Sequence, residues 1–95
     1  MSSQRYDIIR ALLNAAFEPA RLELHDESHQ HAGHAGAEGG RGHYRVHIVS
    51  ARFAGLRMIA RHQLVYRSLG DLMQTDIHAL SITAHTPDEA PGTAH

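Results

Sequence analysis

The sequence contains no cysteine. This absence excludes disulfide bonds, a thiolate metal cage and a cysteine nucleophile, and it fits a reducing compartment. No apolar run approaches the roughly 20 residues that a membrane span needs. The N-terminal segment MSSQRYDIIRALLNAAF does not have the pattern of a secretory signal, because Asp7 and Arg10 interrupt its apolar positions. With 95 residues in total, we expect one small cytoplasmic domain with no membrane partner.

Recognised catalytic motifs are also lacking. The chain has no GxSxG, no HExxH and no phosphate-binding Walker loop. Asp26 and Glu27, with histidines nearby, could be drawn as an acid–base set. We expect them to lie on a flexible loop, however, and so small a domain has little room for a substrate cavity. We therefore expect a protein that is not an enzyme.

Acidic side chains are absent from residues 39–70, where six arginines lie, at positions 41, 45, 52, 57, 61 and 67. Residues 1–38 have three arginines against six acidic residues, and residues 71–95 have four acidic residues and no arginine. A basic middle segment between acidic ends favours an anionic partner. Alternatively, these arginines are solvated and their stems cover apolar surface. The candidates for contact with nucleic acid or a protein partner are Arg45, Arg57, Arg61 and Arg67.

Hydrophobic periodicity predicts six elements, in the order helix, strand, strand, helix, short helix, strand. They are a helix over 6–17 that ends before Pro19, strands over 21–25 and 43–50, a helix over 58–69, a short helical turn at 72–73 and a strand over 77–85. On the second helix, we expect a buried face of Met58, Ile59, His62, Val65, Tyr66 and Leu69. The segment from Thr86 onward is expected to be frayed.

These elements predict a small α+β domain, with a three-stranded sheet and helices on one of its faces. The domain is expected to span residues 1–89, with a disordered tail over 90–95. Residues 26–42 are expected to form a flexible connection between the first two strands. Connections of this length, about 17 residues, are usually functional or disordered.

The stretch from His25 to His43 holds five of the ten histidines. Imidazole is the main candidate ligand for a transition metal in a chain without cysteine. His29, His31 and His34 lie close together in sequence and could hold zinc. They could equally be solvated histidines of a mobile loop, because glycine lets such a segment move at low steric cost.

Four segments together resemble the BolA family: DESHQHAGHAG, GGRGHYRVHIVSARFAGL, RHQLVY and IHALSITAHTPDE. The resemblance covers roughly residues 5–89. It implies a fold like that of the class II KH domain, with the element order αββααβ. It also implies a non-enzymatic adaptor that partners monothiol glutaredoxins. In such pairs, a bridging [2Fe-2S] cluster is held by the glutaredoxin cysteine, glutathione and the BolA-type protein. Some members are described as DNA-binding transcriptional regulators.

The same resemblance implies two cluster ligands in this chain. His78 matches the invariant histidine of the family, and the second ligand would be His31 or His34, of which we favour His34. From the residues alone, His78 shares a strand face with Leu80 and Ile82, which indicates a semi-buried histidine at the rim of the core. The isolated chain is not expected to bind the cluster tightly, and it would be a monomer or a weak homodimer.

Four other histidines are not assigned a chemical role. His43 and His62 are expected to be structural, and His47 and His85 are expected to be merely exposed. DNA binding through the arginines remains the alternative function. A KH domain clamps nucleic acid with a GxxG loop between two helices, and here Gly39-Gly40-Arg41-Gly42 falls between two strands instead.

Overall fold

The computed structural model describes residues 2–28 and 42–89. The elements, in chain order, are α1 (Ser2–Phe17), β1 (Arg21–Asp26), β2 (Gly42–Val49), a 3-10 turn η3 (Ala51–Phe53), α2 (Met58–Leu69), α3 (Leu72–Thr75) and β3 (Ile77–His85). The predicted α+β fold and the predicted order αββααβ are confirmed. Most of the predicted connection 26–42 and all of the predicted tail 90–95 lie outside the described residues.

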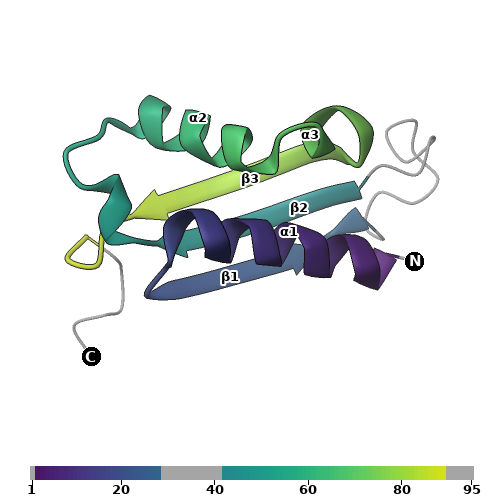
Figure 1. Cartoon of the computed structure of the whole chain (residues 1–95), viewed down its shortest axis with the longest axis horizontal. Coiled ribbons are helices and arrows are strands. Elements are labelled where there is room, and N and C mark those ends of the chain that lie inside the picture. Colours follow the sequence, from purple (N-terminus) through teal and green to yellow (C-terminus); the bar gives the residue numbers. More distant parts are fainter. Residues whose placement is uncertain (1, 29–41, 90–95) are drawn as a thin grey trace.

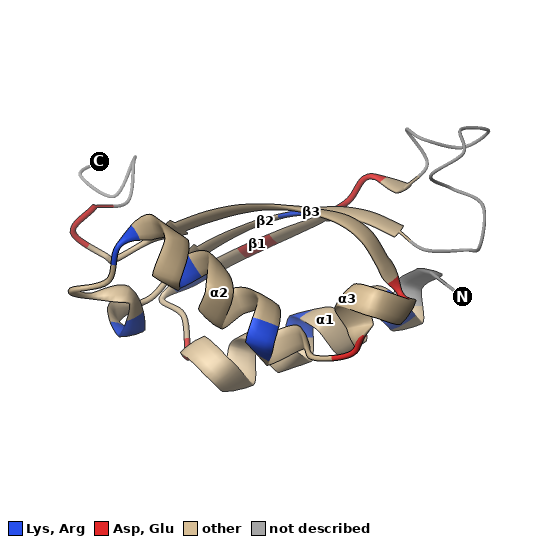
Figure 2. Cartoon of the chain, turned by 90° about the horizontal axis from the view of Figure 1, so that it is seen from above, with Lys and Arg blue, Asp and Glu red and all other residues tan. Residues whose placement is uncertain are grey.

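The three strands form one mixed sheet in the order β1-β2-β3 (Figure 1). β1 and β2 are antiparallel, whereas β2 and β3 are parallel. Because parallel neighbours need a long crossover, the chain leaves β2 through η3, α2 and α3 before it returns as β3. The three helices lie on one side of the sheet (Figure 2). In the described part of the chain, no helix covers the opposite face, which we call the open face.

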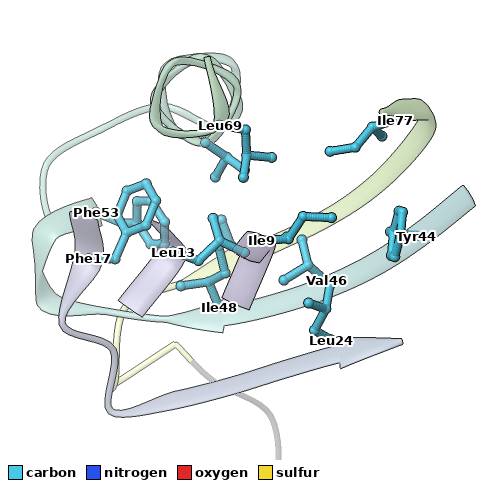
Figure 3. Close-up of a cluster of buried hydrophobic side chains, with 12 residues drawn as sticks. Ile9, Leu13, Phe17, Leu24, Tyr44, Val46, Ile48, Phe53, Leu69 and Ile77 are labelled. Atoms are coloured by element: carbon cyan, nitrogen blue, oxygen red, sulfur yellow. The ribbon is translucent and has the colours of Figure 1, made fainter. Parts of the chain in front are cut away.

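The core lies between the helices and the inner face of the sheet (Figure 3). Along α1, Ile9, Leu13 and Phe17 recur every four residues and are buried. The Phe17 ring packs against Phe53, with ring centroids 5.0 Å apart. Burial of each such large side chain contributes about 1.5–3 kcal/mol. The remaining buried hydrophobic residues of this cluster are Leu24, Tyr44, Val46, Ile48, Val65, Leu69, Ile77 and Ala84.

The predicted buried face of α2 is partly wrong. Met58, Ile59 and Tyr66 are exposed, at 48%, 69% and 41% of their surface. The residues of α2 that are buried are Arg61, Val65 and Leu69, which are spaced four apart. An arginine therefore occupies a core-facing position, and the apolar residues beside it were assigned to the wrong side of the helix.

The buried guanidinium of Arg61 is fully engaged with other groups of the fold. Its Nε donates to the Leu56 carbonyl at 2.9 Å, and Nη1 donates to the Ala84 carbonyl at 3.0 Å. The two Nη atoms contact the Glu89 carboxylate at 2.6 and 3.1 Å. Burying a cation is tolerated when it is paired and hydrogen-bonded in this way. Arg61 thus joins α2 to β3 and to the segment that follows β3.

The segment after β3 is consequently ordered as far as Glu89. Thr86 is only 5% exposed, and its backbone N–H donates to Glu89 Oε1 at 3.1 Å. The hydrogen bond from Arg61, together with the Thr86 N–H, lowers the pKa of Glu89 to about 2. The expectation that the chain frays from Thr86 onward is therefore wrong for residues 86–89.

Candidate functional site

His78 lies at the beginning of β3, where the pairing between β2 and β3 is irregular. Gly42 pairs with Ile77 and His43 pairs with Ala79, so His78 is an extra residue in β3. Such a bulge rotates the backbone and breaks the simple alternation of faces. Ile77 is consequently buried, at 1% exposure, and His78 is exposed. The prediction that His78 is semi-buried on the Leu80 face is wrong for this reason.

His43 lies beside His78 and comes from the start of the neighbouring strand. The two imidazole rings are 4.9 Å apart between centroids and are tilted by 47°. The sequence placed His43 in a structural role and gave no sign of this neighbour. The missing information was the register between β2 and β3, which joins positions 35 residues apart and which only the folded sheet fixes.

The residues on either side of residues 29–41 are fixed close to this pair. The His43 N–H donates to Ser28 Oγ at 3.0 Å, and the Glu27 N–H donates to the His43 carbonyl at 2.8 Å. The Gly42 N–H donates to the Asp76 carbonyl at 2.9 Å. Ser28 and Gly42, the described residues on either side of residues 29–41, therefore lie at the end of the sheet where His78 lies. The predicted ligands His31 and His34 lie outside the described residues.

Gly42 occupies a position that leaves no room for a side chain. A Cβ atom there would lie 2.6 Å from the Tyr44 ring and 2.7 Å from Ser28 Oγ. The Tyr44 ring is 2% exposed, and burial raises the pKa of its hydroxyl. This close packing holds the start of β2, and with it His43, against Ser28, while the hydrogen bond from the Gly42 N–H to the Asp76 carbonyl links it to the residue before β3.

The four arginines predicted to bind a partner do not form one surface. Arg45 alternates along β2 with buried Tyr44 and Val46, so it lies on the open face, where it contacts Glu27 at 3.4 Å. Arg57 and Arg67 are exposed at the two ends of α2, on the helical side. Arg61 is buried in the contacts described above and cannot bind an external anion.

No complete metal site is present within residues 2–28 and 42–89, because no three His, Asp or Glu side chains there are arranged to hold an ion. A site that includes His78 would need ligands from residues 29–41 or from a second molecule. None of the described helices is long and apolar enough to cross a membrane.

Comparison with known proteins identifies the family. The model for the family described as BolA-like protein matches residues 13–89. The chain belongs to the BolA family. It is similar to the protein BOLA1, chloroplastic, of Arabidopsis thaliana, with 44% identity over 87% of this chain and 54% of that protein. It is also similar to the DNA-binding transcriptional regulator BolA of Escherichia coli, with 40% identity over 88% of this chain and 77% of that protein.

Solved structures of BolA domains have the same fold. The BolA domain of SufE1 from Arabidopsis thaliana superposes with a TM-score of 0.80 and 41% identity, over 90% of this chain and 95% of that domain. This BolA-family chain spans about half the length of BOLA1 and 23% of SufE-like protein 1 from the same plant. The Arabidopsis relative is named as a BolA protein and the Escherichia coli relative as a transcriptional regulator, and neither name is that of an enzyme. Because plant relatives are named as chloroplastic, the cytoplasmic location of this chain stays a prediction.

Proposed function

We propose that this BolA-family chain is a non-enzymatic adaptor that shares a [2Fe-2S] cluster with a monothiol glutaredoxin and glutathione. The observation that supports the proposal most is the position of His78. Its side chain is exposed at one end of the sheet, beside His43. Ser28 and Gly42, which flank residues 29–41, are held at the same end of the sheet. An imidazole held on a strand end is rigid and yet accessible to a second protein.

The metal-donor side chains of this sequence fit a cluster that is shared with a second protein better than a cluster that is bound by this chain alone. The chain has no cysteine, and clusters bound by a single protein are usually held by thiolates. Histidine does replace cysteine on iron in Rieske-type clusters, where it raises the reduction potential. The glutaredoxin cysteine and glutathione would supply the thiolates, and this chain would supply neutral imidazoles. The bound cluster would give the complex redox activity or a cargo for transfer.

The second imidazole is assigned to His31 or His34, with His34 favoured. Ser28 lies near the site, and His31 and His34 are three and six residues beyond it. At about 3.3–3.6 Å per extended residue, the chain can place either histidine within reach of His78. Contact with His43 limits the orientations that are open to the His78 ring. We therefore give His43 a positioning role.

The test is a reconstitution with a monothiol glutaredoxin, glutathione, iron and sulfide, followed by visible absorption and circular dichroism. The wild-type chain should convert the glutaredoxin homodimer spectrum into a distinct heterocomplex spectrum. His78→Ala should abolish that conversion. His25→Ala is the matched control, because it removes an exposed histidine from β1, and it should behave as wild type. A heterocomplex spectrum that His78→Ala leaves unchanged would contradict the proposal.

DNA binding is a second candidate, because the Escherichia coli relative is named a DNA-binding transcriptional regulator. Arg57 and Arg67 are the exposed arginines on the helical side that could contact phosphates. Each phosphate contact that is removed should reduce the slope of log K against log salt by about 0.9. In an anisotropy titration, Arg57→Ala with Arg67→Ala should reduce the slope by about 2, and Arg45→Ala on the open face should not. Equal slopes for the wild type, the double variant and Arg45→Ala would exclude DNA binding through Arg57 and Arg67.

A further inference from the structure

The open face of the sheet carries a second pair of histidines, which the proposed function does not use. His47 of β2 and His85 of β3 are both half-buried, and His47 Nε2 lies 3.0 Å from His85 Nδ1. Their rings meet nearly at right angles, at 83°, with centroids 5.1 Å apart. The sequence predicted only that both are exposed. Along β3, His85 lies seven residues beyond His78, about 23 Å at the rise of a strand, so this pair is separate from the site above.

Polar groups and charged groups of both signs lie beside the pair on the same face. Glu23 of β1 is the direct cross-strand partner of His47, and Thr83 of β3 is its partner on the other side. Glu23, His47 and Thr83 line one open hollow together with His25, Glu27 and Arg45, whereas His85 is not part of that lining. The Glu23 carboxylate contacts Arg21 Nε at 2.6 Å. Directly opposed residues have Cβ atoms about 4.5–5.5 Å apart, so the Glu23 carboxylate can reach the His47 ring.

We propose that His47 and His85 form a two-imidazole binding position for a divalent ion of the zinc, nickel or copper type. Glu23 would become the third ligand only after its carboxylate leaves Arg21, since no three-ligand set is in place among the described residues before an ion binds. The proposal is independent of the cluster function. Two imidazoles bound to one tetrahedral zinc ion at about 2.0–2.1 Å have their nitrogens about 3.3 Å apart. The observed separation of 3.0 Å is already within a few tenths of an ångström of that value. Imidazole nitrogen with one carboxylate is a donor set that suits these ions.

The proton on the contact between the two rings must move when an ion binds. Burial, and after it the neighbouring His85, lowers the pKa of His47, which favours the neutral form of that ring. When both rings are neutral, one ring donates its N–H to the other ring. When a metal ion binds, that proton is lost to water and the same ring regains one on its other nitrogen, so a neutral pair releases no net proton. Glu23 must leave Arg21, and an exposed ion pair of this kind contributes little to stability.

The experiment is a zinc titration of the full chain at pH 7.5, observed by NMR of the histidine ring nitrogens. The histidines of residues 29–41 report separately in the same spectra, so their zinc binding does not confuse the result. We expect the Nε2 signal of His47 and the Nδ1 signal of His85 to shift on addition of zinc. Removing two of the other donors with His31→Ala and His34→Ala should leave these two shifts in place.

Variants then identify the ligands by calorimetry, in the background that lacks His31 and His34. His85→Gln and His47→Gln should each weaken zinc binding at least tenfold, and Glu23→Gln should weaken it severalfold. His62→Gln, on the helical side of the sheet, is the matched control and should have no effect. The proposal is wrong if the His47 and His85 signals stay unchanged in the wild-type chain. It is equally wrong if His85→Gln, with a well-dispersed spectrum, binds zinc as tightly as its parent.

Discussion

At the start of β3, one extra residue determines which side chain meets solvent. Because Gly42 pairs with Ile77 and His43 pairs with Ala79, Ile77 faces the core and His78 faces outward. The same irregularity brings the rings of His43 and His78 together. A regular strand would have directed His78 inward, as strict alternation predicted. The exposure of the candidate ligand is therefore a property of the pairing between two strands.

The packing around Gly42 supports this arrangement, and Gly42→Ala tests it. The added methyl group would meet the Tyr44 ring at 2.6 Å and Ser28 Oγ at 2.7 Å, so the start of β2 must move. Overpacking of this kind costs about 1–3 kcal/mol of unfolding free energy, measurable by urea denaturation. In the reconstitution assay, the variant should also give less heterocomplex. Wild-type values in both measurements would show that Gly42 does not hold the site.

At the level of residues, the sequence predicted the site through its motifs and not through composition. The IHAL motif identified His78 as a candidate, and the side chain of that residue is exposed to solvent. The role of His43 was missed, because two strands distant in sequence had to be aligned to reveal it. Arg61 was assigned to a binding surface, but it is buried. Nothing in the local sequence shows that Glu89 and two backbone carbonyls accept hydrogen bonds from its guanidinium.

At the scale of elements, α2 shows where periodicity fails. The pattern gave the bounds of the helix correctly, since Met58–Leu69 is both expected and observed. It gave only part of the buried face. Val65 and Leu69 are buried as predicted, but Arg61 also faces inward, while Met58, Ile59 and Tyr66 face solvent. Strand bounds were predicted to within one residue at each end, because strand alternation reflects burial directly. Helix orientation depends on long-range contacts such as the one between Arg61 and Glu89.

The contact between α2 and the segment after β3 makes stability depend on pH. The pKa of Glu89 is lowered from 4.5 to about 2 in the folded chain. Its contribution is therefore present above pH 4.5 and is lost as the pH falls toward 2. In urea denaturation across this range, wild type should lose stability more steeply than Glu89→Gln, which should already be less stable at pH 7. High salt should reduce the difference, because the Glu89 side chain is 44% exposed. Parallel curves for the two proteins would contradict this assignment.

At the scale of the whole molecule, the sheet separates two sides of the domain that carry different candidate binding residues. The helical side holds the core and the exposed arginines of α2, whereas the open face holds Arg45 and the His47–His85 pair. The element order and the fold class followed from the sequence. The separation of the arginines onto opposite sides did not, because it depends on how the sheet folds against the helices.

The adaptor role predicts that the chain and the cluster depend on a partner. Alone with iron and sulfide, the chain should not retain a [2Fe-2S] cluster through gel filtration. With a monothiol glutaredoxin and glutathione, it should elute as a heterodimer with one cluster per pair, as judged by sedimentation and iron content. A stable cluster on the isolated chain would show that the partner is dispensable.

The most direct test of the central claim, that this chain gives imidazole ligands to a shared cluster, is electron–nuclear double resonance on the reduced heterocomplex. The chain would be labelled with ¹⁵N in its histidine rings, and the glutaredoxin and glutathione would be unlabelled. We predict strongly coupled ¹⁵N from directly bound imidazole in the wild-type heterocomplex, and no heterocomplex with the His78→Ala protein. A heterocomplex whose reduced cluster shows no strongly coupled ¹⁵N would contradict the account.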